Sequence, residues 1–79
     1  DEDVFSQAGL KEMQTALAEA IEELPEKEKL VLSLYYTDEL TRKETGDVIG
    51  ETESRVSQLH YQAIIRLRSK LRKRQLLQD

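Results

Sequence analysis

The side chains best suited to specific chemistry lie close together, between residues 53 and 62. They are hydrogen-bonding groups of several kinds: Glu53, Ser54, Arg55, Ser57, Gln58, Tyr61 and Gln62. A glutamine amide can donate and accept at once, so it can form two hydrogen bonds with an adenine edge in a DNA major groove. Serine and arginine can bind base edges or phosphates, and a glutamate can accept from cytosine or bind a helix N-terminus. The alternative is an ordinary solvated helix face.

Catalytic chemistry has little support. The chain has one histidine, His60, and no cysteine, and it contains neither a glycine-rich phosphate loop nor a metal-ligand spacing. His60 follows the apolar Leu59 and is predicted to lie on a helix surface. Glu22 and Glu23 are adjacent, so their carboxylates point in different directions and form no acid–base pair. We expect no enzymatic activity, no cofactor and no bound metal.

The net charge of −4 is unusual for a nucleic-acid binder, but the charges are unevenly distributed. Residues 1–40 carry three lysines against eleven acids, whereas residues 41–79 carry nine bases against five acids. Such asymmetry indicates either a nucleic-acid face on one side or two solvated faces. The bases at 66–74 suit the C-terminal end of a helix dipole. They could also pair with the acidic half or with an acidic partner, so we do not assign them to DNA.

Apolar residues recur at three- and four-residue steps, which is typical of amphipathic helices, and no stretch alternates like a strand. A first helix is predicted at about 8–23, and Pro25 separates it from a second at about 26–37. The first apolar stripe is Leu10, Met13, Leu17, Ala20, Ile21 and Leu24; in the second helix, Leu30, Val31, Leu34 and Tyr35 should point inward.

Capping signals define two further helices. Thr41 and Glu44 form a capping-box pattern, which predicts a short third helix from residue 42 to the turn at Gly50. Thr52 can then cap a long fourth helix at about 53–73. Its predicted buried stripe is Val56, Leu59, Ala63, Ile64, Leu67 and Leu71.

The third and fourth predicted helices suit a helix-turn-helix. Gly46 provides the small residue where the helices cross, Gly50 provides the turn, and Val56 and Leu59 anchor the second helix. The start of the fourth helix would then enter a major groove, while Arg42 and Lys43 would contact phosphates. The expected fold is all-α: one four-helix domain over residues 1–79, with a long C-terminal recognition helix, order over about 8–73 and frayed termini.

Two segments resemble region 4 of bacterial sigma-70 family factors. LPEKEKLVLSLYY at 24–36 is similar to the opening of that region. ESRVSQLH at 53–60, followed by QAI at 62–64 and RLRSKL at 66–71, resembles the flagellar subgroup closely. The similarity covers about residues 16–71, and sporulation sigma factors of the same subgroup share the motif.

The resemblance implies recognition of the promoter −35 element by a domain attached to RNA polymerase through the flap of its β subunit. It assigns base reading to Ser54, Arg55, Ser57 and Gln58, and DNA-backbone contacts to Arg42 and Lys43. It also implies a flagellar anti-sigma factor that covers apolar surface of the domain. In the flagellar subgroup the −35 elements are A/T-rich, which suits a recognition helix that carries Gln58 and serines. The lack of cysteine fits a reducing cytoplasm, and no apolar run approaches the roughly 18 residues of a membrane span.

Two positions depart from the family pattern. Thr45 stands where an aliphatic residue is usual, and we expect its methyl group to be buried with its hydroxyl bonded to the preceding turn. Glu51 stands just after the turn glycine, where an apolar residue is common, and we expect it to face water.

Two other functions fit the residues. The acidic half could form the docking surface of a helical protein-interaction module, with the helix-turn-helix only as scaffold. The chain could also be the DNA-binding output domain of another regulator, a class that usually dimerises on paired half-sites.

Overall fold

The computed structural model describes residues 6–77, which contain four helices and no strand. They are α1 (Gln7–Glu22), α2 (Glu26–Tyr36), α3 (Arg42–Ile49) and α4 (Glu53–Lys73). The predicted all-α class and all four helices are confirmed. Fraying was expected at 1–6 and 75–79; of these, 1–5 and 78–79 lie outside the described residues, whereas Ser6 is described and caps α1. None of the helices described is long and apolar enough to cross a membrane.

Local capping sets where the helices begin and end. Ser6 accepts a hydrogen bond from the amide of Gly9 at 2.9 Å and caps α1. Thr41 and Glu44 form both halves of a capping box at α3, and Thr52 accepts from the amide of Arg55 at 3.1 Å at the start of α4. These caps satisfy amide donors that have no partner within the helix.

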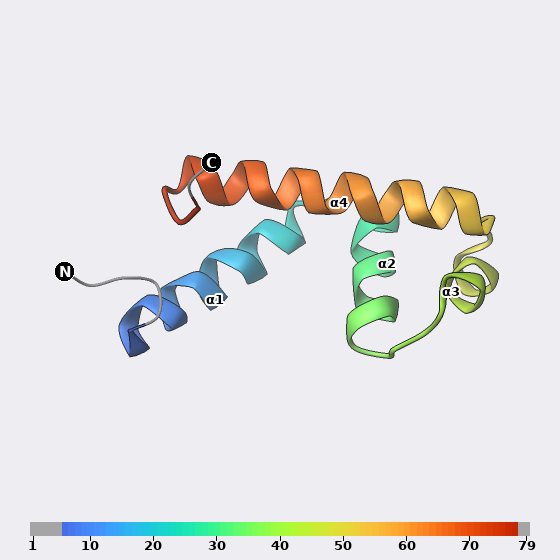
Figure 1. Cartoon of the computed structure of the whole chain (residues 1–79), viewed down its shortest axis with the longest axis horizontal. Coiled ribbons are helices and arrows are strands. Elements are labelled where there is room, and N and C mark those ends of the chain that lie inside the picture. The colour runs from blue at the N-terminus through green and yellow to red at the C-terminus, as the bar shows by residue number, and fades with distance from the viewer. Residues whose placement is uncertain (1–5, 78–79) are drawn as a thin grey trace.

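The long helix α4 is the element on which the other three pack (Figure 1). Figure 1 shows α1 below its C-terminal half, α2 crossing below its middle, and α3 next to its first turn. The molecule is therefore elongated, with extents of 46 × 21 × 18 Å. The first turns of α4 contact α3, whereas its C-terminal half contacts α1.

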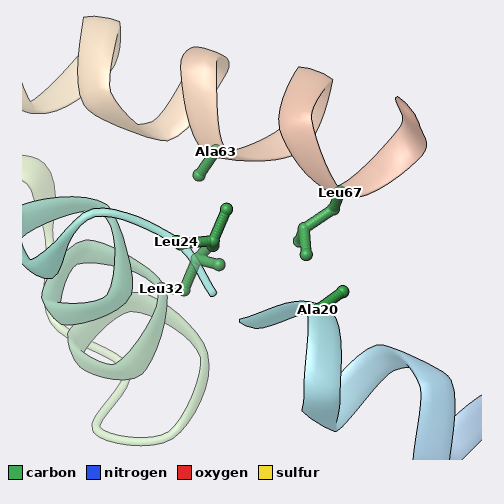
Figure 2. Close-up of a cluster of buried hydrophobic side chains, with 5 residues drawn as sticks. All are labelled: Ala20, Leu24, Leu32, Ala63 and Leu67. Atoms are coloured by element: carbon green, nitrogen blue, oxygen red, sulfur yellow. The ribbon is translucent and has the colours of Figure 1, made fainter. Parts of the chain in front are cut away.

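Two clusters of buried side chains join α4 to its neighbours. The first core cluster lies where α1, α2 and α4 meet and contains Ala20, Leu24, Leu32, Ala63 and Leu67 (Figure 2). The second core cluster lies below the start of α4 and contains Val31, Val56 and Leu59, with Tyr35 and Ile49 packed against it. The predicted stripe of α4 is confirmed at all positions except Ile64, which is half-buried.

Parts of the two other predicted stripes are wrong. Leu30 is 39% exposed, because the buried face of α2 is centred on Glu28, Val31 and Leu32, and Leu30 lies on its outer side. In α1, Leu10 is 47% and Leu17 36% exposed, because the helix packs through Ala16, Ala20 and Ile21 and its first turns diverge from α4 (Figure 1).

Glu28 is the unexpected member of the buried set. Only 2% of its surface is exposed, because α4 passes over the first turn of α2. Its Oε2 accepts from Nε of Arg66 at 3.1 Å, whereas its Oε1 has no hydrogen-bond partner among the described residues. A buried carboxylate with one partner depends strongly on that partner.

The bases of the C-terminal half of α4 pair with the acidic half of the chain. Arg66, Lys70 and Arg74 occur at four-residue steps and so share one side of α4. They pair with Glu28, Glu23 and Glu19 at 3.1, 2.8 and 2.7 Å respectively. The interpretation of these bases as partners of the acidic half is therefore confirmed for these three.

We expect Lys70→Met to destabilise the chain near neutral pH and to have a smaller effect in acid. The hydrogen bond and the charge of Lys70 lower the pKa of Glu23. A carboxylate whose pKa is lowered by folding stabilises the fold above its ordinary pKa, and this contribution disappears as the pH falls through the folded pKa. Urea denaturation at pH 7 and pH 3 measures both effects. Lys73→Met is the control, because Lys73 is exposed and makes no ion pair within residues 6–77. An equal loss at both pH values would contradict this prediction.

We expect Arg66→Met to cost more stability than Glu28→Met. The first change leaves a buried carboxylate without its partner, a cost of about 1–3 kcal/mol given that the Arg66 side chain is half exposed. The second removes the buried charge and its unsatisfied oxygen, and frees Arg66 to reach water. Chemical denaturation gives both free energies of unfolding, with Arg68→Met as an exposed control. The reverse order would show that Glu28 stabilises the fold by other contacts.

Candidate nucleic-acid interface

The connection from α3 to α4 has the geometry of a helix-turn-helix. Gly50 ends α3 in the left-handed region at φ 76°, and the amides of Gly50 and Glu51 both donate to the carbonyl of Gly46, at 2.8 and 2.9 Å. A Cβ atom at Gly46 would lie 2.4 Å from the carbonyl oxygen of Glu51, so only glycine fits there. Both predicted glycine roles are confirmed.

The start of α4 is anchored from below. Val56 is fully buried and Leu59 is 4% exposed, and both pack against Val31 of α2 in the second core cluster. These contacts fix the rotation of α4 about its axis. Its opposite side, which carries the polar residues, is therefore turned to solvent.

All nine predicted DNA-contact residues lie at the start of α3 or on the first half of α4. Eight of them are exposed and Ser57 is half-buried: Arg42, Lys43, Glu53, Ser54, Arg55, Ser57, Gln58, Tyr61 and Gln62. We call this surface the reading face. The polar side of α4 is not buried against the acidic half of the chain, so it is free to contact another molecule.

Hydrogen bonds organise the centre of the reading face. Nη1 of Arg42 donates to Oγ of Ser57 at 3.1 Å, which joins α3 to α4. Nη1 of Arg55 donates to Oε1 of Gln58 at 3.2 Å within α4. Two side chains expected to read bases are thus each held by an arginine.

Lys43 lies beside an acid of its own helix. Its Nζ is 3.7 Å from a carboxylate oxygen of Asp47, and both side chains are almost three-quarters exposed. An exposed pair of this kind contributes little to stability. Lys43 can therefore exchange Asp47 for a phosphate at small cost.

Glu51 does not simply face water, as the sequence predicted. It forms an ion pair with Lys27 in the first turn of α2, and only 21% of its side chain is exposed. The hydrogen bond from Lys27 lowers the pKa of Glu51, and the charges of Lys27 and Arg55 lower it further. The pair ties the turn to α2 and partly offsets the negative charge that Glu51 brings near the reading face.

Thr45 also differs from its prediction. It is fully buried, as expected, but its hydroxyl has no hydrogen-bond partner among the described residues. The expected hydrogen bond from this hydroxyl to the preceding turn is therefore not formed. An unpaired buried hydroxyl reduces the stability of the motif.

His60 belongs to an aromatic cluster that sequence reasoning missed. Its Nε2 lies 2.8 Å from the hydroxyl of Tyr36, and its ring centroid lies 4.9 Å from that of Tyr35. Both tyrosines come from α2, more than 20 residues away, so no local sequence signal could show this cluster. His60 therefore links α2 to α4 and is half-buried. Among residues 6–77, no group of three acidic, histidine or cysteine side chains is placed to hold a metal ion.

An apolar depression lies between α1 and α2 and is closed by the C-terminal half of α4. We call it the apolar groove; it has a volume of about 490 Å³. Its lining is Leu17, Ile21, Lys29, Leu32, Ser33, Tyr36, Thr37, Ile64 and Leu67. The sequence did not predict it, because it depends on the angle between α1 and α2. Its chemistry suits an apolar helix face of a partner.

Comparisons with known proteins agree with this geometry. RNA polymerase sigma factor FliA of Escherichia coli K12 is 69% identical over 55 residues, which are 70% of this chain and 23% of that protein. FliA of Pseudomonas aeruginosa is 62% identical over 58 residues, 73% of this chain and 24% of that protein. RNA polymerase sigma-D factor of Bacillus subtilis is 48% identical over 62 residues, 78% of this chain and 24% of that protein. The chain thus spans about a quarter of the length of these relatives.

A solved structure supports the same relationship. The cocrystal structure of the flagellar sigma/anti-sigma complex, Sigma-28/FlgM, matches with a TM-score of 0.73 and 38% identity, over 90% of this chain and 30% of that one. Residues 20–69 match the family Sigma-70, region 4. This chain therefore belongs to the Sigma-70, region 4 family, and over this region it is similar to the FliA sigma factors.

Proposed function

We propose that this domain recognises the promoter −35 element as part of a sigma factor that directs RNA polymerase to flagellar and motility genes. The observation that carries the proposal is the exposed reading face, held rigidly by the Gly46 crossing and the second core cluster. In this proposal the domain works in the cytoplasm and acts by binding, not by catalysis.

The residues of the reading face divide by chemistry. Arg42 and Lys43 begin α3 and can bind phosphates, which positions the domain without reading sequence. Ser54, Ser57 and Gln58 can contact base edges if the first turns of α4 enter a major groove. The flanking residues Glu53, Tyr61 and Gln62 extend the same exposed surface.

The apolar groove is the proposed docking surface for protein partners. Ile64 and Leu67 line it from the side of α4 that packs on α1 and α2, whereas Gln58 lies on the exposed side. DNA and a partner can therefore bind α4 at the same time. We assign the groove to the β flap of core RNA polymerase. An anti-sigma factor that covered it would compete with polymerase, and a solved relative in complex with FlgM supports such a partner.

We expect Gln58→Ala in the full-length sigma factor to weaken binding of its polymerase complex to promoters with the −35 element. A lost pair of base contacts corresponds to about 1–3 kcal/mol of discrimination against wrong bases. Filter binding or fluorescence anisotropy with matched and altered −35 sequences measures it. Gln14→Ala is the control, because Gln14 is an exposed glutamine on α1. Unchanged discrimination in Gln58→Ala would count against the proposed reading face.

We expect Leu17→Glu to weaken association with core RNA polymerase by roughly tenfold, since a charge would enter an apolar contact. Leu17 lines the groove and is 36% exposed, so the fold should tolerate the change. Ala18→Glu places the same charge on the neighbouring exposed position of α1. Titration of labelled full-length protein with core enzyme measures both. Equal affinities for the two variants would exclude the groove as the docking surface.

A further inference from the structure

The hydrogen bond between Arg55 and Gln58 fixes the direction of an amide group. A guanidinium has only donors, so the atom of Gln58 that faces Arg55 must be the amide oxygen. The observed contact, Nη1 to Oε1 at 3.2 Å, has this arrangement. The amide nitrogen is consequently turned away from Arg55, and rotation of the amide by half a turn would place two donors against each other.

The backbone of Arg55 is fixed by the cap of α4, and its side chain lies near a charged turn. Its backbone amide donates to Thr52 Oγ1 at 3.1 Å, so it occupies a fixed place in the first turn of α4. Its guanidinium charge acts on the carboxylate of Glu51, which is held in turn by Lys27 of α2. The guanidinium of Arg55 thus lies in the field of Glu51, which Lys27 ties to α2, and it donates to Gln58 on the exposed side of α4.

The direction of the amide matters because of what purines present in the major groove. Adenine and guanine both have an N7 acceptor, but position 6 is a donor in adenine and an acceptor in guanine. An amide that rotates freely can meet either base with a suitable atom. An amide held in one direction places oxygen and nitrogen in one order and therefore favours one purine.

We propose that Arg55 is a specificity-determining residue that acts through Gln58, by fixing the order in which the amide oxygen and nitrogen meet one base pair of the −35 element. This inference rests on the proposed function, since it needs the reading face to lie in a major groove. It gives Arg55 a role other than a phosphate contact or a direct guanine contact.

The test uses the full-length sigma factor bound to core RNA polymerase and a set of promoters in which each −35 base pair is exchanged in turn. The variants are Arg55→Met, Gln58→Ala, their combination and Lys43→Met. We expect the wild type to prefer one purine at one position by at least about fivefold. Arg55→Met should reduce that preference to within about twofold, while its discrimination at the other −35 positions changes little. Gln58→Ala should reduce the preference at the same position by a similar factor.

The combined variant and the control separate the possible roles. If Arg55 acts through Gln58, the combination should show the same discrimination as Gln58→Ala alone. Lys43→Met should weaken binding to every promoter by the same factor, as expected for a phosphate contact. Arg55→Lys keeps the charge, and its preference should lie between those of the wild type and Arg55→Met, because an ammonium can donate but lacks the fixed planar fork. Thermal melts of the variants check that each is folded.

Three results would overturn the inference while leaving the proposed function intact. A uniform loss of affinity in Arg55→Met, with a salt slope smaller by about 0.9, would make Arg55 a phosphate contact. If Arg55→Met altered the base preference at a position that Gln58→Ala leaves unaffected, Arg55 would contact that base directly. An unaltered preference in Arg55→Met would show that the amide needs no restraint. A wild-type complex without any base preference in the −35 element would instead refute the proposed function, and this inference with it.

Discussion

The close approach of Gly46 to the carbonyl oxygen of Glu51 is the contact on which the geometry of the interface depends. A Cβ atom at this position would lie 2.4 Å from that oxygen, so any other residue would force α3 and α4 apart. The same crossing lets the carbonyl of Gly46 accept from the amides of both Gly50 and Glu51. The turn is therefore short and rigid, and α4 begins beside α3 with its polar side outward. The reading face follows from this close approach together with the second core cluster, which fixes the rotation of α4.

The basic residues of 41–79 fall into two groups, one at the C-terminal end of α4 and one at the reading face. Arg66, Lys70 and Arg74 are paired with acids of α1 and α2, so much of the basic tail is neutralised within the fold. The bases at the reading face are Arg42, Lys43 and Arg55, and each contacts a polar or acidic neighbour. A net charge of −4 is thus compatible with a local basic surface. Few phosphates can be bound by so few bases, which favours a domain that binds DNA weakly alone and firmly within a larger complex.

The sequence predicted what local interactions determine. The caps at Thr41 and Thr52 and the turn at Gly50 depend on neighbours within a few residues and were found as expected, and the stripe of α4 was found except at Ile64. The predicted burial of Leu30 was wrong because the buried face of α2 is set by where α4 crosses it. The ion pair of Glu51 with Lys27 and the contact of Glu28 with Arg66 join residues 24 and 38 positions apart. The apolar groove needs the angle between two helices, so no periodicity could indicate it.

The open groove and the charged contacts of α1 have a common cause. Helix α1 meets α4 through the small residues Ala16 and Ala20, while Leu10 and Leu17 are left partly exposed. Two alanines and the partly buried Ile21 bury a modest apolar area, and the pairs of Glu19 with Arg74 and Glu23 with Lys70 add to the docking of α1. These pairs are exposed, so each contributes little to stability and its contribution falls with salt. A partner that buried Leu10 and Leu17 would supply the apolar contact that the domain lacks, and it would bind and fix the orientation of α1 in one step.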